Sequence, residues 1–134
     1  MNDSQPTWTG RTIGGRYTIQ ALLGRGGMSS VYKATDPNLQ RTVAIKIIHP
    51  HLSEHPEFVK RFEQEAAAVA RLRHPNIMLV HDFNHDGSVY YIVFEFIAGN
   101  PLDKRLKDLK EAGLRLPLEE TIQIMVPLCE AVAY

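Results

Sequence analysis

The sequence of 134 residues has a single cysteine and no net charge, and it lacks any long hydrophobic run. The lone Cys129 excludes an internal disulfide and is typical of a reducing compartment. Fifteen Lys and Arg residues balance fifteen Asp and Glu residues, so no overall field favours nucleic acid or an anionic membrane. No apolar run approaches the roughly 20 residues that a membrane span requires.

The N-terminus lacks the basic and apolar segments of a secretion signal. Residues 1–15 are polar and contain three glycines and a proline, which predicts a flexible leader with little structure of its own. With the single cysteine, this composition favours a cytoplasmic location. A chain of this length forms one domain at most, yet it is long enough to bury a core.

Alternating apolar positions predict a mostly antiparallel sheet. Residues 16–48 are expected to form three consecutive strands, with one turn at a glycine cluster and another at residues 36–38. Residues 77–83 and 88–96 predict two further strands, joined by a loop that ends in glycine. Five strands beside one large helix indicate an α+β unit.

Three segments have the apolar spacing of helices. Residues 57–72 form the long one, and a proline stands immediately before its start, as helix entries favour. Residues 102–112 predict a short charged helix. Residues 117–134 predict an apolar helix in which Pro127 is expected to cause a kink or a break.

The turn between the first two predicted strands is dense in glycine: Gly24-Arg25-Gly26-Gly27-Met28-Ser29. Glycine adopts positive φ angles and leaves no Cβ between backbone and ligand, so successive N–H groups on such a turn form an anion site. A strand follows the turn, which argues against a dinucleotide-binding fingerprint. No Gly-Lys-Ser/Thr follows, which argues against a Walker-type loop. A tight hairpin that is merely rich in glycine is the alternative interpretation.

Lys46 lies in the middle of a strand-like run, where alternation places it on the same face as Ala44. The small Ala44 side chain leaves room beside the ammonium group for a flat ligand. An edge-strand lysine that discourages aggregation is the plainer alternative. The nearby glycine turn favours a lysine that faces a ligand.

Helical periodicity places Glu65 within the apolar stripe of the long helix, between Phe62 and Val69. A carboxylate directed toward a core needs a cationic partner. Arg61, one turn earlier, is the local candidate. Lys46 is the preferred partner, with a gross Coulomb energy of about 4 kcal/mol at an effective dielectric of about 20. We therefore predict a Lys46–Glu65 ion pair that is breakable, because desolvation offsets much of this gain.

These segments resemble the N-terminal lobe of a eukaryotic-type protein kinase, and most closely the bacterial serine/threonine kinases. The resemblance runs from about Arg16 to Tyr134, and the order and spacing of its motifs make it specific. The motifs are Leu23-Gly24-Arg25-Gly26-Gly27-Met28-Ser29-Ser30-Val31-Tyr32, Val43-Ala44-Ile45-Lys46, Arg61-Phe62-Glu63-Gln64-Glu65-Ala66, His74-Pro75-Asn76-Ile77 and Tyr91-Ile92-Val93-Phe94-Glu95-Phe96.

The resemblance implies a fold as well as a function. It implies a kinase-like N-terminal lobe over residues 16–97, with a five-stranded antiparallel sheet and one large helix. Residues 98–134 would form the exit from the hinge and the first two helices of a truncated C-terminal lobe. Residues 1–15 would remain outside this lobe as the leader.

The resemblance also implies an ATP site at the glycine turn. Gly24, Gly26 and the turn between them would cover the phosphates, and Ser29 stands where many kinases have a third glycine. Lys46 would contact the α- and β-phosphates while Glu65 holds it in place, which makes these two the expected catalytic residues. The expected nucleotide-binding residues of the turn are Gly24, Arg25, Gly26, Gly27, Met28 and Ser29.

An adenine pocket is implied beside the phosphate site. The residues that would sandwich the base are Leu23, Val31 and Ala44. Phe94 would be the gatekeeper that closes the pocket behind the adenine. The backbone of Glu95 and Ile97 would hydrogen-bond the adenine edge, which would leave both side chains free to vary.

The family's remaining catalytic elements do not occur in the 134 residues. The resemblance implies that the catalytic loop, the Asp-Phe-Gly metal site, the activation loop and the peptide-binding lobe follow Tyr134. Metal ions and a positioned nucleophile supply most of the stabilisation in phosphoryl transfer. We expect a full-length parent that uses ATP and Mg²⁺ to phosphorylate Ser and Thr hydroxyls of proteins. This chain, without a metal ligand of its own, is expected to be inactive alone.

Two alternatives remain open. The first is a non-catalytic, pseudokinase-like module that binds nucleotide or a protein without turnover. A native stop codon after Tyr134 would favour it, whereas a longer open reading frame with a catalytic loop would favour the enzyme. The second is an unrelated antiparallel α+β binding domain in which Lys46 and Glu65 face solvent.

Residues 49–56 contain three histidines and two prolines, so no single regular element is expected there. His49, His51 and His55 lie within seven residues of one another, but no fourth metal ligand is evident. A solvated loop before the long helix is the preferred interpretation.

The last predicted helix has an apolar face that the resemblance assigns to the core of the second lobe. Its members are Ile122, Ile124, Met125, Val126, Leu128 and Val132. Exposed together, these side chains would exceed the apolar patch that a soluble monomer tolerates. We therefore expect self-association or partial disorder of residues 117–134.

Overall fold

A computed structural model describes residues 7–134, which divide into two compact units. The first unit contains the described residues up to Leu72 together with Leu79–Phe96. The second contains Arg73–Met78 together with Ile97–Tyr134. Each unit is described here by itself.

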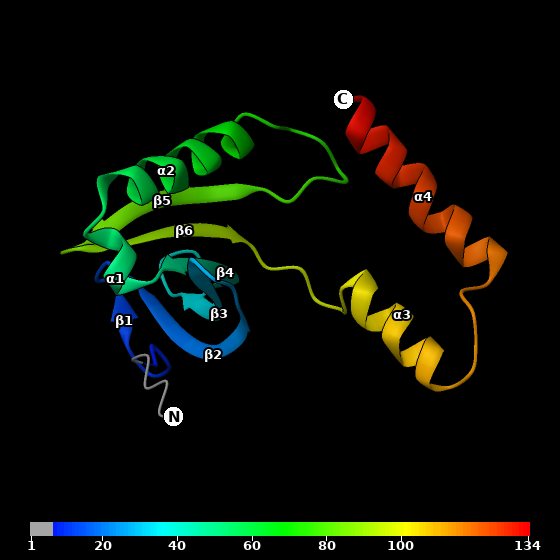
Figure 1. Ribbon diagram of the computed structural model, residues 1–134. Coiled ribbons are helices and arrows are strands. Elements are labelled where there is room, and N and C mark those ends of the chain that lie inside the picture. Colours follow the sequence, from blue (N-terminus) through cyan, green and yellow to red (C-terminus); the bar gives the residue numbers. More distant parts are fainter. Residues whose placement is uncertain (1–6) are drawn as a thin grey trace. The chain divides into compact units, whose positions relative to one another are not determined.

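The first unit is an antiparallel sheet with a long helix on one face (Figure 1). Its strands are β1 (Thr12–Ile13), β2 (Tyr17–Arg25), β3 (Ser29–Asp36), β4 (Arg41–Ile48), β5 (Val80–Asp86) and β6 (Val89–Glu95), in the spatial order β1-β2-β3-β4-β6-β5. Its helices are the one-turn α1 (Pro50–Ser53) and the long α2 (Pro56–Ala70). The predicted α+β fold is confirmed, and β1 is a sixth strand beyond the five expected.

Strand alternation gives the sheet an apolar core on each face. One core contains Val43, Ile45 and Ile47 of β4, packed with tyrosines of β2 and β6. Ala44 and Ile48 point to the opposite face and pack with side chains of α2. Because Lys46 alternates with these residues, β4 presents it on the face that α2 covers.

The predicted leader differs from the structure over residues 7–15, while residues 1–6 lie outside the described range. Ile13 of β1 is completely buried, and Trp8 packs against the same core. Gly14 turns the chain back into β2 with a φ of +62°. A few large apolar side chains therefore order a segment whose composition is otherwise that of a loop.

The two edges of the sheet approach each other, because side chains of the edge strand β5 reach the segment around β1. The Gly14 amide donates a hydrogen bond to Asp86 Oδ2 at 2.8 Å, and the Tyr17 hydroxyl lies 3.5 Å from Asp82 Oδ2. The sheet is thus curled over the core that contains Tyr17.

Asp36 at the end of β3 is completely buried, and two arginines neutralise it. Arg16 donates to both carboxylate oxygens at 2.9 Å, and Arg41 Nε donates to Oδ2 at 3.2 Å. The pKa of Asp36 is lowered to about 2, and the hydrogen bonds from Arg16 are the largest cause. This cluster joins the β1–β2 corner to the β3–β4 turn.

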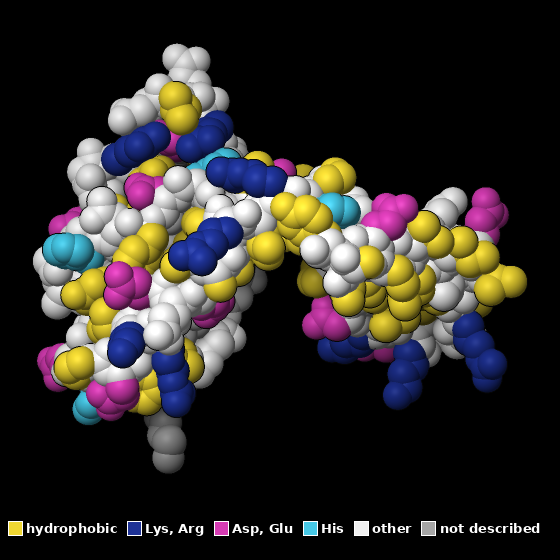
Figure 2. Space-filling model, turned by 90° about the horizontal axis from the view of Figure 1, so that it is seen from above, with side chains coloured by type: hydrophobic (Ala, Val, Ile, Leu, Met, Phe, Trp, Pro, Cys, Tyr) yellow, Lys and Arg dark blue, Asp and Glu magenta, His cyan; other side chains and the backbone are white. Residues whose placement is uncertain are grey.

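The second unit contains α3 (Leu102–Glu111) and α4 (Leu118–Ala133). Arg105 and Glu120 join the two helices through a bidentate ion pair with N–O distances of 3.0 and 3.1 Å. Pro127 was expected to kink or break this helix, and α4 is one continuous helix that contains it, so the break is not present. Hydrophobic side chains gather on this unit, as Figure 2 shows. None of the helices within residues 7–134 combines the length and apolarity needed to cross a membrane.

Candidate functional site

Lys46 and Glu65 form the expected ion pair. Lys46 Nζ, from the middle of β4, lies 2.7 Å from Glu65 Oε1 on α2. The strand places the ammonium group on the face that α2 covers, and the helix places the carboxylate above it. The alternative in which both side chains face solvent independently is therefore wrong.

The pair is less buried than the apolar stripe of the helix predicts. The Lys46 side chain is 25% exposed and the Glu65 side chain 50% exposed. The buried positions of α2 are Phe62 and Ala66, which pack onto the sheet and leave Glu65 at the margin of the contact. The pair consequently remains accessible to a ligand and to water.

A cavity of about 210 Å³ opens at this ion pair. The residues that line it are Met28, Ser29, Lys46, Arg61, Phe62 and Glu65. Two cationic side chains and one carboxylate thus line one cavity together with Met28 and Ser29, where β3 begins. Arg61 was predicted only as an alternative partner of Glu65, yet it also lines this cavity, because residues one turn apart lie on one side of a helix.

The glycine turn differs from the expectation in its backbone conformation. Gly24 belongs to β2, opposite Val31, and the Gly26 amide donates to the Ser29 carbonyl at 2.8 Å. None of Gly24, Gly26 and Gly27 has a positive φ. The positive φ angles lie elsewhere in the described chain, so the turn itself does not require glycine for its dihedral angles.

These three glycines are distinguished by the open space beside them and not by their φ angles. A Cβ atom added at Gly24 or Gly27 would meet nothing within 4 Å, and one at Gly26 would lie 3.4 Å from the Ser29 carbonyl oxygen. The protein's own packing leaves this space open. The backbone of the turn can therefore be approached closely from outside.

The side chains expected at the adenine lie on the same face as Lys46. Val31 is directly opposite Lys46 in the β3–β4 pairing, and Ala44 is directly opposite Phe94 in the β4–β6 pairing. Ala44 and Phe94 are both buried at 8% exposure. Leu23 is half-exposed and falls at an irregularity between the paired Leu22 and Gly24, which is typical of a β-bulge.

Glu95 has a structural contact that the sequence did not predict. Its amide donates to the Leu79 carbonyl oxygen at 2.9 Å, and its carboxylate accepts a hydrogen bond from the Leu79 amide at 3.1 Å. The expectation that this side chain is free to vary is wrong, because it satisfies a backbone donor at the start of β5. Ile97 belongs to the second unit and is 62% exposed.

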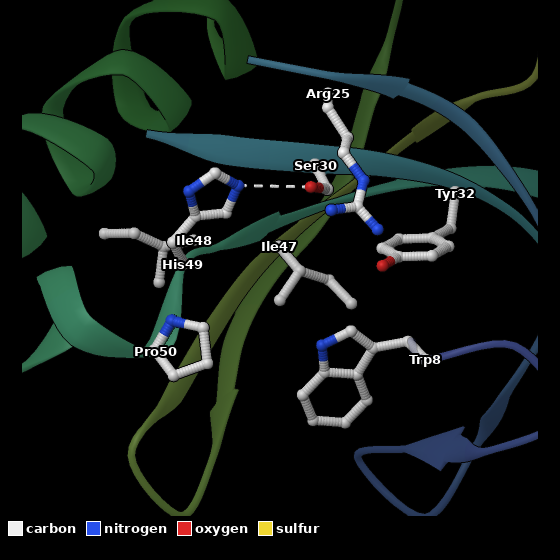
Figure 3. A pocket seen from close by; sticks show the side chains of 8 residues that line it. All are labelled: Trp8, Arg25, Ser30, Tyr32, Ile47, Ile48, His49 and Pro50. Atoms are coloured by element: carbon white, nitrogen blue, oxygen red, sulfur yellow. Dashed lines mark hydrogen bonds between the residues drawn. The ribbon is translucent and has the colours of Figure 1, made fainter. Parts of the chain in front are cut away.

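The three histidines before α2 do not converge. His49 is buried with its ring against Ser30, and His55 lies 3.8 Å from Glu57. Across residues 7–134, no group of three or more His, Cys, Asp and Glu side chains is placed to hold a metal ion. The Ser30–His49 contact was missed, since an apolar strand followed by a histidine-rich loop gave no signal for it (Figure 3).

Comparison with known proteins agrees with this geometry. Residues 17–134 match the protein kinase domain family. The chain is 41% identical over 115 residues to the serine/threonine-protein kinase PknA of Mycobacterium tuberculosis, covering 82% of the chain and 27% of PknA. It is 38% identical over 125 residues to the serine/threonine-protein kinase PrkC of Bacillus subtilis, covering 93% of the chain and 19% of PrkC.

The fold has a similar solved counterpart. The crystal structure of the Mycobacterium tuberculosis PknI kinase domain matches with a TM-score of 0.73 at 28% identity, over 94% of this chain and 50% of that domain. The chain thus spans about half of a solved kinase domain and less than a third of the curated relatives named above. With its family match, its curled antiparallel sheet and its Lys46–Glu65 pair, the chain belongs to the protein kinase domain family and is similar to bacterial serine/threonine kinases.

Proposed function

We propose that this chain is the ATP-binding part of a serine/threonine protein kinase. The observation that carries the proposal is the 2.7 Å Lys46–Glu65 contact at the rim of an open cavity. In protein kinases a lysine on this strand and a glutamate on this helix must both be in place for phosphoryl transfer. Glu65 would hold the Lys46 ammonium group where it can contact the α- and β-phosphates.

The glycine turn fits a phosphate group. At Gly24 and Gly27 the position of a Cβ is open space, so a ligand can lie directly against the backbone. Backbone N–H groups on such a turn attract anions. The turn would cover the phosphates, while Met28 and Ser29 border the cavity that contains Lys46. Arg25 and Gly26 complete this covering segment.

The adenine would lie beside Val31 and Ala44, with Leu23 above it. The buried Phe94, directly opposite Ala44, would limit the depth of the pocket as the gatekeeper. The amide of Glu95 is already bonded to Leu79, so its carbonyl group is the part that remains for the adenine edge. The backbone of Ile97 would provide the second contact.

We infer that the 134 residues alone bind ATP without transferring its γ-phosphate. Mg²⁺ supplies charge neutralisation in this chemistry, and the segments that hold it in kinases do not occur in this sequence. Protein substrates would bind through the C-terminal lobe. A non-catalytic nucleotide-binding module remains the second candidate on this ground. Steady phosphorylation of a generic substrate by the purified chain would contradict the inference.

Nucleotide titration tests the site. Lys46→Ala should weaken ATP binding at least about tenfold, which corresponds to roughly 1.4 kcal/mol. Lys60→Ala, on the exposed side of α2, is the matched control and should bind like the wild type. Urea denaturation of each variant separates lost binding from lost folding. Equal ATP affinity of the folded wild type and Lys46→Ala would overturn the proposed site.

A further inference from the structure

His49 lies behind the glycine turn. Its backbone amide donates to the Met28 carbonyl oxygen at 2.9 Å, and its ring Nε2 lies 3.1 Å from Ser30 Oγ. The residue is only 8% exposed. One residue therefore contacts both the turn and the first part of β3, through its backbone and through its side chain.

The space beside this contact is small. Figure 3 shows the ring directed at Ser30, with Trp8, Tyr32 and Ile47 along the same hollow. The remaining cavity is about 10 Å³, at the lower limit of what a single water requires. The Ser30–His49 pair consequently has no room for a substrate, and its chemistry is that of a structural hydrogen bond.

The opposite side of the same turn borders the candidate site. Met28, whose carbonyl receives the His49 amide, lines the cavity that contains Lys46, as does Ser29. His49 follows Lys46 by three residues and immediately precedes α1. It is thus connected by short stretches of backbone to the turn and to the lysine.

The environment of His49 lowers its pKa and so favours the neutral ring. Burial is the largest cause of the lowered pKa of His49, and electrostatic interactions with His51 and Arg25 act in the same direction. Hydrogen bonds with the backbone of Gly27 and Ser29 raise the pKa of His49 and partly offset this effect. The titratable and charged groups that face the ring are His51 on α1, Arg25 on β2 and Tyr32 on β3.

We propose that His49 is a positioning residue of the nucleotide site. Its ring holds Ser30 and its amide holds Met28, so that the turn, closed by the Gly26–Ser29 hydrogen bond, keeps the N–H groups of Gly27 and Met28 in a fixed place for the phosphates. The role rests on the proposed binding of ATP. The prediction that the ring immobilises the turn can be tested without nucleotide.

Hydrogen exchange of the nucleotide-free chain is the first test. His49→Ala should raise the exchange rate of the Gly26 amide about fivefold, the factor expected for one lost hydrogen bond, and leave the β6 amides unchanged. His49→Gln should restore most of the protection, and His55→Ala, at an exposed histidine away from this contact, is the control. Ser30→Ala removes the ring's partner without a large cavity and should act like His49→Ala. Unchanged exchange at Gly26 in both variants would overturn the proposal.

Titration with ATP and with adenosine is the second test. His49→Ala should weaken ATP binding about fivefold and leave adenosine binding unchanged, because only ATP has phosphates for the turn to contact. An equal loss for both ligands would indicate a general structural effect and contradict the role. If the wild type binds neither ligand, the proposed function fails, whereas the exchange experiment still decides whether His49 holds the turn.

The pH dependence provides a readout that a merely structural role would not give. The pKa of His49 is lowered in the folded chain. The neutral ring's contribution to the stability of the turn is therefore fully present above the ordinary histidine pKa and is lost as the pH falls through the pKa of the folded chain. As the pH falls from neutral through the folded pKa of His49, ATP affinity should therefore fall more in the wild type than in His49→Gln. The phosphates of ATP titrate equally in both, so identical profiles would contradict the proposal.

Discussion

Gly14 and Gly24 differ in what surrounds the position of their missing Cβ atom. At Gly14 a Cβ would collide with the Tyr91 hydroxyl oxygen, and the φ of +62° is one that other residues rarely adopt. At Gly24 the same position is empty and φ is ordinary. The fold therefore needs the first glycine, whereas nothing in the protein's own packing requires the second, which would be free to serve the proposed ligand.

Alanine substitutions should separate these two requirements. Gly14→Ala should lower the free energy of unfolding by about 1–3 kcal/mol, because it combines backbone strain with a collision. Gly24→Ala should change it by less than about 0.5 kcal/mol and should weaken ATP binding. Urea denaturation and nucleotide titration of both variants measure these effects. A severe loss of stability in Gly24→Ala would show that the turn has a packing role.

The partners of the Lys46–Glu65 pair were predictable, whereas its exposure was not. Strand alternation around Ala44 and helical spacing around Phe62 are local properties, and they fix which side each charged group faces. How far α2 extends over the sheet depends on the volumes of all the side chains beneath it. That packing leaves Glu65 half-exposed at the margin.

At the scale of elements, the Arg16–Asp36–Arg41 cluster joins strand ends that are distant in sequence. The Asp36 carboxylate is completely buried and accepts hydrogen bonds from both guanidinium groups and from the Asn38 amide. A buried carboxylate depends on such partners. The cluster therefore fixes how the β1–β2 corner meets the β3–β4 turn.

Asp36→Asn should lower the free energy of unfolding by about 2 kcal/mol, since hydrogen bonds to charged groups are lost. The lowered pKa of Asp36, about 2, means that its contribution is present above the unfolded carboxyl pKa of 3.8 and is lost as the pH falls toward 2. Stability should thus decrease between pH 5 and pH 2 in the wild type, and less in Asp36→Asn. Urea denaturation across this range checks the difference, and parallel profiles would contradict it.

At the scale of the whole molecule, α4 exposes a large apolar surface. The exposed side chains are Leu118, Ile122, Met125, Val126, Leu128 and Val132, of which Val132 is 80% exposed. Several of them recur at helical spacing along one side. Apolar surface of this extent marks an interaction site or an aggregation hazard.

We expect the chain to self-associate through α4. Light scattering should give a mass above the 15.2 kDa of one chain and increasing with concentration. The double variant Ile122→Lys with Val126→Lys should shift the chain toward monomer, whereas Leu39→Lys, at an exposed apolar residue of the first unit, should not. A monomeric wild type whose α4 amides are strongly protected from exchange would contradict this expectation.

Local patterns determined the strands β2 to β6, the helices α2, α3 and α4, and the Lys46–Glu65 partnership, because period-two and helical spacing act within a few residues. The tertiary structure alone decided the order of residues 7–15, the contacts of Glu95 with Leu79 and of His49 with Ser30, and the open space at Gly24. Each of these depends on groups brought together from distant parts of the chain, where close packing and the pairing of buried polar groups select the neighbours.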